Sequence, residues 1–116
     1  MSAQVRRYAG RILLDFDGRY VREFAGPILY EFDGKYVRRF AGRILYQISG
    51  DTISEFAGGI LFTFDGQYLR RFAGRILYEV RGNYIQEFAG PILYELSGNW
   101  GKTELMVLFA ILEGGL

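Results

Sequence analysis

Apolar and polar residues alternate along this chain in short runs, and a glycine closes almost every run. A representative pair is Gly26–Asp33 followed by Gly34–Ala41, and each half carries about six residues between its turn positions. Tyr, Phe, Val and Ile, which favour strands, occupy most of the alternating apolar positions. The pattern therefore predicts a succession of short β-strands joined by tight turns.

The alternation gives each pair of strands two faces, because successive side chains of a strand point to opposite sides. One face is almost wholly apolar and is predicted to form the core; in the pair above it carries Ile28, Tyr30, Phe32 and Val37. The other face mixes charged and apolar residues; it carries Leu29, Glu31, Tyr36, Arg38 and Phe40. This second face is expected to be partly covered or to leave aromatic surface exposed.

The pattern repeats every sixteen residues without an insertion. The dipeptide Ala-Gly marks each unit, with its alanine at Ala9, Ala25, Ala41, Ala57, Ala73 and Ala89. A second glycine falls midway, at Gly18, Gly34, Gly50, Gly66, Gly82 and Gly98. We count six full repeats, preceded by Ala3–Tyr8, which matches only the second half of a unit. Arg6 and Arg7 in that half suit an edge strand, because charges discourage pairing with another chain.

The two kinds of turn differ in chemistry. Asp17-Gly18, Asp33-Gly34 and Asp65-Gly66 are strong hairpin signals of type I′, a turn with positive φ at both central residues. Ala-Gly is a poor pair for that turn, because alanine disfavours positive φ. The Ala-Gly turns are therefore expected to be of another type, or to be arcs of a solenoid coil.

Charges at two positions of the repeat alternate from unit to unit. The residue two places before the alanine is Arg7, Glu23, Arg39, Glu55, Arg71 and Glu87. The residue two places after it is Arg11, Pro27, Arg43, Gly59, Arg75 and Pro91. Opposite charges on neighbouring strands stabilise a sheet by about 0.2–1 kcal/mol per pair. Consecutive units are therefore expected to lie side by side in register.

These observations favour different architectures. A β-solenoid with two strands per coil explains the charges well, because its coils lie about 4.8 Å apart. The Asp-Gly turns favour hairpins, and a doubled period of 32 residues would give a prism of three four-stranded units. We predict a mainly β, single-domain array over residues 1–101, built as an antiparallel hairpin meander that is curved or closed. The solenoid and the prism are the alternatives.

Residues 102–116 are predicted to form an apolar helix within the same domain. Thr103 is placed to cap its start and Gly114-Gly115 to end it. Because apolar residues surround the helix, it must be buried, either capping an open end of the array or plugging a barrel. The functional alternative is a helix that binds another chain, with an interface made of Leu105, Val107, Leu108, Phe109, Ile111 and Leu112.

Composition narrows the classes of function. The 116 residues include 14 Lys and Arg against 13 Asp and Glu, a formal charge of +1 that gives no field to hold nucleic acid or an anionic membrane. The chain lacks His, which is the commonest general base and the commonest metal ligand. It also lacks Cys, so disulfides and thiol chemistry are excluded. Because we find no signal peptide and no transmembrane run, a cytoplasmic location is the default expectation.

Carboxylates are the remaining candidates for acid–base chemistry or metal binding. One repeat position carries them at Asp15, Glu31, Glu79 and Glu95, whereas Gln47 and Thr63 replace them in other units. A position that accepts any polar residue is typical of a solvated strand face. We therefore predict no catalytic residue, no metal site, no cofactor and a protein that is not an enzyme.

An aromatic column runs through equivalent positions of the repeat, at Tyr30, Tyr46, Tyr78 and Tyr94, with Phe62 between them. Beside the arginines of another column, it resembles a stacking platform for a base or a sugar. Such ladders more often serve packing, at about 0.5–1.5 kcal/mol per pair. The Tyr column is therefore a candidate stacking column for a small ligand, and the charge balance disfavours nucleic acid.

The string Ile-Leu-Tyr-Glu-Phe-Asp-Gly-Lys-Tyr-Val-Arg at 28–38 resembles small bacterial β-hairpin-repeat proteins. It is similar to the beta-flower and MORN/YwqK-like groups, which share strands punctuated by Asp-Gly or Asn-Gly. The period of sixteen and the Phe-Ala-Gly turn depart from those patterns. The resemblance implies a bacterial hairpin array and no activity.

Packing, turns or charge pairing account for every position of the repeat, so the sequence favours a function that needs no active site. The leading hypothesis is a non-enzymatic structural or interaction protein that forms a homo-oligomer, or binds another protein, through its mixed face, its edges or its helix. The alternative is a small-ligand or glycan binder with a Tyr-lined pocket in a closed β-array. Neither hypothesis includes nucleic acid or a membrane as a partner.

Overall fold

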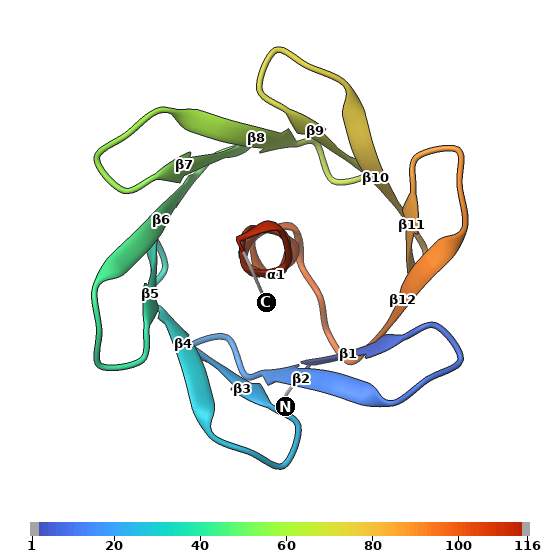
Figure 1. Ribbon diagram of the computed structural model, residues 1–116, viewed down its shortest axis with the longest axis horizontal. Helices are drawn as coiled ribbons and strands as arrows, with labels where there is room; N and C mark the ends of the chain where they lie inside the picture. The colour runs from blue at the N-terminus through green and yellow to red at the C-terminus, as the bar shows by residue number, and fades with distance from the viewer. Residues whose placement is uncertain (1–2, 115–116) are drawn as a thin grey trace.

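A computed structural model describes residues 3–114 of the chain. Twelve strands form one closed barrel around a single helix, α1 (Lys102–Glu113) (Figure 1). The strands are β1 (Ala3–Arg7), β2 (Ile12–Phe16), β3 (Tyr20–Glu23), β4 (Ile28–Phe32), β5 (Tyr36–Arg39), β6 (Ile44–Ser49), β7 (Thr52–Glu55), β8 (Ile60–Phe64), β9 (Tyr68–Arg71), β10 (Ile76–Arg81), β11 (Tyr84–Glu87) and β12 (Ile92–Ser97).

Each Ala-Gly turn joins two strands into a hairpin, and these hairpins, here called petals, radiate around α1 (Figure 1). The closed hairpin meander is thus confirmed. The solenoid and prism alternatives are wrong, because every strand pairs antiparallel with its sequence neighbours within one barrel. The alternating charges that favoured a solenoid are accommodated by neighbouring petals of a ring.

The structural unit runs from one midway glycine turn to the next. Counted in this way, the N-terminal segment Ala3–Tyr8 is the first strand of the first petal rather than a separate half repeat. The petals are β1–β2, β3–β4, β5–β6, β7–β8, β9–β10 and β11–β12. The structure therefore has six petals in all, and the predicted count of six full repeats plus a half was too high by half a repeat, because the unit that begins at Gly90 contributes only β12 before the helix.

The petal turns place alanine, not glycine, in the left-handed region. Ala9 has φ 57°, and all six alanines of these turns lie within 55–57°. The amide of Gly10 donates to the carbonyl of Arg7 at 2.8 Å, as in a four-residue β-turn. A Cβ on Gly10 would stand 3.1 Å from the Cβ of Arg7, so a side chain at this position would crowd Arg7. The Ala-Gly turns are therefore not of type I′, as predicted, because the alanine has positive φ and the glycine after it does not.

The Asp-Gly turns are two-residue hairpin loops in which glycine holds the first central position. Gly34 has φ 102°, and the following residue, Lys35, is not in the left-handed region. Positive φ at the first position alone is the pattern of type II′ rather than of the predicted type I′. The Oδ1 of Asp33 accepts hydrogen bonds from the amides of Tyr36 at 2.8 Å and Lys35 at 3.0 Å. These bonds, with that of Tyr36 foremost, lower the pKa of Asp33.

A β-bulge stands at the base of every petal. In the first petal the register shifts where Val5 pairs with Leu14 but Arg6 pairs with Ile12, and the equivalent shift recurs in the other five. A bulge bends its strand and increases the local twist. The bulges therefore turn the petals away from the barrel axis.

The first and last strands close the ring. β1 pairs with β12 over Gln4–Arg7, and Arg6 stands opposite Glu95. The amide of Tyr8 donates to the carbonyl of Leu93 at 3.0 Å, the same bond that links the other neighbouring petals. β1 is therefore not the edge strand that its arginines suggested, because β12 pairs with it as β2 pairs with β3 in the neighbouring petals.

Helix α1 fills the interior of the barrel. Seven consecutive residues, Leu105–Ile111, are buried, because the helix is surrounded by strands on all sides (Figure 1). A barrel of about eight strands can be filled by its own side chains, so a wider one needs a plug. The apolar strand face joins this core as predicted, since Tyr30, Phe32 and Val37 are all buried.

The helix begins differently from the prediction. Its N-cap is Gly101, so Thr103 lies inside the first turn and makes no capping bond. A Cβ on Gly101 would meet the carboxylate end of Glu104, a flexible side chain that can move away, so this contact does not by itself require glycine. Lys102 forms an ion pair with Asp51 in the β6–β7 turn, which fixes the start of α1 to that end of the barrel. Gly115, the second glycine expected to end the helix, lies outside the described residues.

Among residues 3–114, no helix has the length and apolar character needed to cross a membrane.

Candidate functional site

Three grooves open at the end of the barrel where α1 finishes. The Arg43 groove is lined by Tyr30, Arg39, Arg43, Ile44, Leu45, Tyr46, Glu55, Phe56, Ile111 and Gly114. The Arg75 groove is lined by Arg71, Arg75, Ile76, Leu77, Tyr78, Glu87, Phe88 and Glu113. The Arg11 groove is lined by Arg11, Ile12, Leu13, Leu14, Glu23, Phe24 and Leu29. Their lining residues are related by steps of two repeats, since 43 − 11 = 32 and 75 − 43 = 32.

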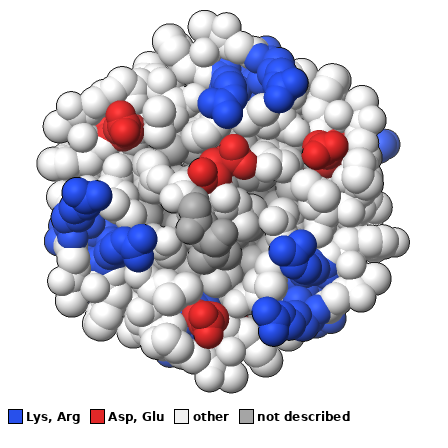
Figure 2. Space-filling model, viewed as in Figure 1, with Lys and Arg blue, Asp and Glu red and all other residues white. Residues whose placement is uncertain are grey.

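The threefold pattern comes from charge, whereas the backbone is sixfold. Petals with an arginine pair alternate with petals that carry a glutamate, and Figure 2 shows the blue and red groups alternating around this face. Because the number of petals is even, the alternation of charge continues across the β1–β12 closure. The last petal carries Glu87 and the first carries Arg7, so like charges do not meet there. Each groove therefore has arginine on one side and glutamate on the other.

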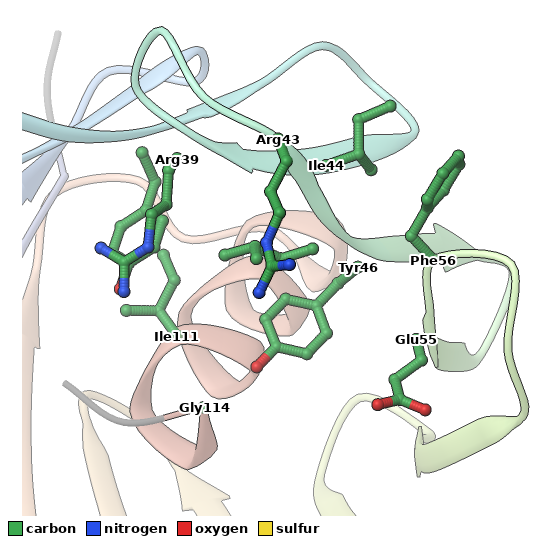
Figure 3. Close-up of a pocket in the computed structure, with 10 residues that line it drawn as sticks. Arg39, Arg43, Ile44, Tyr46, Glu55, Phe56, Ile111 and Gly114 are labelled. Carbon is green, nitrogen blue, oxygen red and sulfur yellow. The ribbon is translucent and has the colours of Figure 1, made fainter.

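The Arg43 groove is the largest of the three, with a cavity volume of about 710 Å³. The guanidinium of Arg39 lies over the ring of Tyr30, 5.7 Å from its centroid. Figure 3 shows Arg39, Arg43 and Tyr46 turned toward the same space beside α1, with Glu55 set apart from the two guanidinium groups. Burial raises the pKa of the Tyr46 phenol, so its hydroxyl remains a hydrogen-bond donor.

Neither arginine of this groove is neutralised by a neighbouring carboxylate. Within the described part of the chain, the ion pairs are Arg19–Glu31, Arg81–Glu79 and Lys102–Asp51. Glu55 lines the same groove as Arg39 and Arg43 but is not within ion-pair distance of either. The groove therefore gathers two guanidinium groups whose donors remain available to a bound group.

The Arg75 groove contains a carboxylate of the protein itself. The hydroxyl of Tyr78 donates to Oε2 of Glu113, the last residue of α1, at 2.6 Å. Burial and then this hydrogen bond raise the pKa of Tyr78. The cavity is smaller, about 450 Å³, and Arg71 lies over the ring of Phe62 at 5.9 Å. The helix end thus occupies the groove that is equivalent to the Arg43 groove.

The Arg11 groove has the least polar chemistry. Leu14 replaces the tyrosine found at position 46 or 78, so no hydroxyl faces this cavity from the repeat. Its volume is about 260 Å³. The three grooves therefore share one backbone plan but offer three different environments.

Comparison with known proteins places the fold. Residues 3–112 match the family described as 6-fold beta flower protein. The chain belongs to the 6-fold beta flower protein family. Neither a curated protein nor a solved structure matched the chain.

Membership of the beta flower family confirms the first of the two resemblances drawn from the repeat, the one to the beta-flower group. It supports a small structural repeat protein with internal hairpin repeats.

The predicted stacking column lines the inner wall of the beta flower. Tyr30 is buried, and Tyr46, Tyr78 and Tyr94 are half-buried and packed against the core. Of these, Tyr30 and Tyr46 line the Arg43 groove and Tyr78 lines the Arg75 groove. The column is therefore divided among separate grooves rather than forming one open stacking surface.

The helix residues considered as an interface lie inside the barrel. Leu105, Val107, Leu108, Phe109 and Ile111 are buried in the core, and Leu112 is partly buried against it. Their placement joins α1 to its own barrel, with the ring of Phe109 stacked on Tyr78 at 5.7 Å.

The carboxylates at the position of Glu31 do not form a common site. Glu31 pairs with Arg19 on the outer face, and Glu79 lies near Arg81. Among the residues that the structure describes, no group of three or more acidic side chains could hold a metal ion.

A Tyr-lined pocket was one of the two hypotheses, but the arginines and glutamates that line the grooves were missed, although the signal for them was present. The alternation at Arg39 and Arg43 was interpreted as contact between units, not as the lining of a cavity. The position of α1 inside the ring makes the cavities, and no local pattern reports that position.

Proposed function

We propose that this beta flower is a binding protein, rather than an enzyme, and that it takes a small ligand in the Arg43 groove. The observation that carries this proposal is the convergence of Arg39, Arg43 and Tyr46 on the largest of the three grooves at the mouth of the barrel (Figure 3). This proposal corresponds to the alternative hypothesis drawn from the sequence, a small-ligand binder with a Tyr-lined pocket in a closed β-array.

The size and lining of the groove support a ligand of small-molecule dimensions. Its volume of about 710 Å³ falls within the range of roughly 300–1,000 Å³ that is usual for such sites. Ile44, Leu45 and Ile111 supply apolar wall, and a few polar groups supply orientation. A rigid barrel with an internal helix holds these groups on regular elements, which suits a preformed site.

A blocking substitution tests the proposal. Ile44→Trp places a large ring in the groove, and Ile28→Trp is the matched control, because Ile28 has the same repeat position but lines none of the three grooves. A small-molecule fragment panel is screened by ligand-observed NMR on the full chain. We expect fragments that bind the wild type and Ile28→Trp but not Ile44→Trp. Fragments that bind all three proteins equally would refute the proposal.

Self-association is the second candidate function, and exposed petal-tip rings favour it. One aromatic residue at each tip is about half exposed: Tyr8, Phe24, Phe40, Phe56, Phe72 and Phe88. Four of them pack edge-on against a tyrosine of another petal, whereas Phe24 and Phe72 make no such described pair. Because the barrel is closed and α1 is inside it, these outer rings are the surface that such an assembly would use.

Light scattering on the full chain tests this second candidate. An oligomer that becomes a monomer in a Phe24→Ser, Phe72→Ser double variant would support association through the petal tips. Lys35→Ser, on a midway turn away from the tips, is the control. A wild-type monomer at all concentrations would remove self-association and leave the ligand-binding proposal alone.

A further inference from the structure

The chemistry of the ligand can be inferred by comparing two equivalent grooves of the same molecule. Arg39, Arg43 and Tyr46 correspond to Arg71, Arg75 and Tyr78 after a step of 32 residues. Glu55 likewise corresponds to Glu87, whereas Tyr30 is replaced by Phe62. The arginines, the glutamate and one tyrosine are therefore common to the two grooves, and the backbone that carries them repeats. What differs is the content of each groove.

The Arg75 groove already holds a carboxylate. Glu113 ends α1 on the side of β10, where its Oε2 accepts the hydrogen bond of Tyr78 at 2.6 Å. The contact is partly buried, and a short hydrogen bond to an ionised acceptor is a strong one. Neither Arg71 nor Arg75 is within ion-pair distance of Glu113 among the described residues, so Tyr78 alone bonds this carboxylate, and the groove beside the two arginines accommodates it in the folded protein.

The Arg43 groove has no equivalent of Glu113. Helix α1 presents Ile111 and Gly114 to this groove, and neither carries an acceptor side chain. Glycine is required at 114, because a Cβ there would collide with the hydroxyl of Tyr46. Among the described residues, Tyr46 makes no side-chain hydrogen bond and the two arginines make no ion pair.

We infer that the Arg43 groove binds a small molecule bearing an oxyanion, a carboxylate or a phosphate, in the role that Glu113 has in the Arg75 groove. Arg39 and Arg43 supply planar donor groups that match the geometry of either anion, and Tyr46 supplies a hydroxyl donor. Glu55 sets a limit on total charge, because its carboxylate lines the same groove. The inference rests on the proposed function and adds the ligand class to it.

Calorimetric titration of the full chain distinguishes the two anions. The probes are succinate, inorganic phosphate and neutral succinamide, which matches succinate in length. We expect saturable binding of an oxyanion that weakens as salt rises, and none of succinamide. Tighter binding of succinate identifies a carboxylate ligand, and tighter binding of phosphate identifies a phosphate ligand. Succinamide that binds as well as succinate would overturn the inference.

Substitutions assign the binding to this groove. Arg39→Gln with Arg43→Gln should lower affinity for the better oxyanion by about tenfold or more, and Tyr46→Phe by several-fold. Glu55→Gln should raise it, because it removes a like charge from the groove. Arg11→Gln, in the Arg11 groove, is the control and should leave affinity unchanged. An unchanged affinity in the Arg39, Arg43 double variant contradicts the assignment, provided that the thermal unfolding of that variant matches the wild type.

Removing Glu113 tests whether the Arg75 groove is equivalent to the Arg43 groove. Glu113→Ala removes the carboxylate from the Arg75 groove and should add a second oxyanion site to each chain. Tyr78→Phe in that background should weaken the new site and spare the first. A single site in Glu113→Ala, with the protein folded, would show that the two grooves are not equivalent and would overturn the inference.

Failure of the ligand class is distinguishable from failure of the binding function. Neutral fragments that bind in the Arg43 groove and are excluded by Ile44→Trp, together with no binding of any oxyanion, would refute the ligand class alone. If neither oxyanions nor neutral fragments bind the wild type, both the ligand class and the proposed function fail.

Discussion

The turns of this chain use glycine and alanine for different steric reasons. In each petal tip the glycine is placed where a Cβ would meet the side chain three residues earlier, and the alanine before it accepts positive φ. In the midway turns the glycine takes positive φ itself, and in three of the six an aspartate before it accepts hydrogen bonds from two backbone amides. Glycine is therefore favoured at the petal tips because a side chain would crowd its neighbour, and at the midway turns because φ is positive.

Adjacent substitutions in one petal tip should have opposite effects on stability. Ala57 has φ 57°, which costs a non-glycine residue about 1–2 kcal/mol, more than the added flexibility of glycine. Ala57→Gly should therefore raise the free energy of unfolding by about 0.5–1 kcal/mol. Gly58→Ala should lower it, because its Cβ would stand 2.9 Å from the Cβ of Glu55. Urea unfolding measures both, and a loss of stability in Ala57→Gly would contradict the account of the turn.

The aspartates of the midway turns should make stability depend on pH in acid. Backbone amides, those of Tyr36 and Tyr68 first, lower the pKa of Asp33 and Asp65 in the folded protein. A lowered folded pKa stabilises above the unfolded pKa of about 3.9, and the contribution is lost as pH falls through the folded value. Asp33→Asn with Asp65→Asn should flatten the fall in melting temperature below about pH 4. An equally steep fall in the variant would exclude these groups as its cause.

At the scale of elements, strands and helix depend on each other. Each strand has only four to six residues, and a barrel of twelve strands is too wide for its own side chains to fill. Helix α1 has apolar residues on every side, so it would not be stable alone in water. The ring gives the helix its burial, and the helix gives the ring its core.

A cavity in the helix core should cost far more than one at its end. Phe109 is fully buried between Phe64, at 5.3 Å, and Tyr78, at 5.7 Å, so Phe109→Ala should lower the free energy of unfolding by about 3–5 kcal/mol. Leu112→Ala, on the same helix but partly exposed, is the control and should cost less. Chemical denaturation of the two variants is the measurement, and equal losses would mean that α1 is not held as described.

At the scale of the whole molecule, the sequence predicted the strands, the hairpins, the helix and the burial of one strand face. Those properties depend on local alternation, turn residues and apolar surface, which are visible in a single repeat. Closure depends on the bend that six bulges add up to, and the β1–β12 pair joins residues far apart in the chain. The grooves depend further on where α1 lies inside the ring, so Arg39 and Arg43 could be recognised as a pattern but not as a site.

The two ends of the barrel have different chemistry as a result. The start of α1 is packed by Trp100, whose indole donates to the carbonyls of Gln4 and Ser97, each at 3.1 Å. The end of α1 is surrounded by the three charged grooves (Figure 2). Oxyanion binding is therefore expected at the end of the barrel where α1 finishes. The indole signal of Trp100 reports on the opposite end.

Amide and indole NMR spectra of the full chain, titrated with succinate and separately with inorganic phosphate, would locate the oxyanion site directly. We expect saturable shift changes confined to Arg43–Tyr46, Glu55 and the end of α1 near Gly114 for at least one of the two anions, and no change in the indole signal of Trp100. Shift changes centred on Trp100, or none anywhere with either anion, would contradict this expectation.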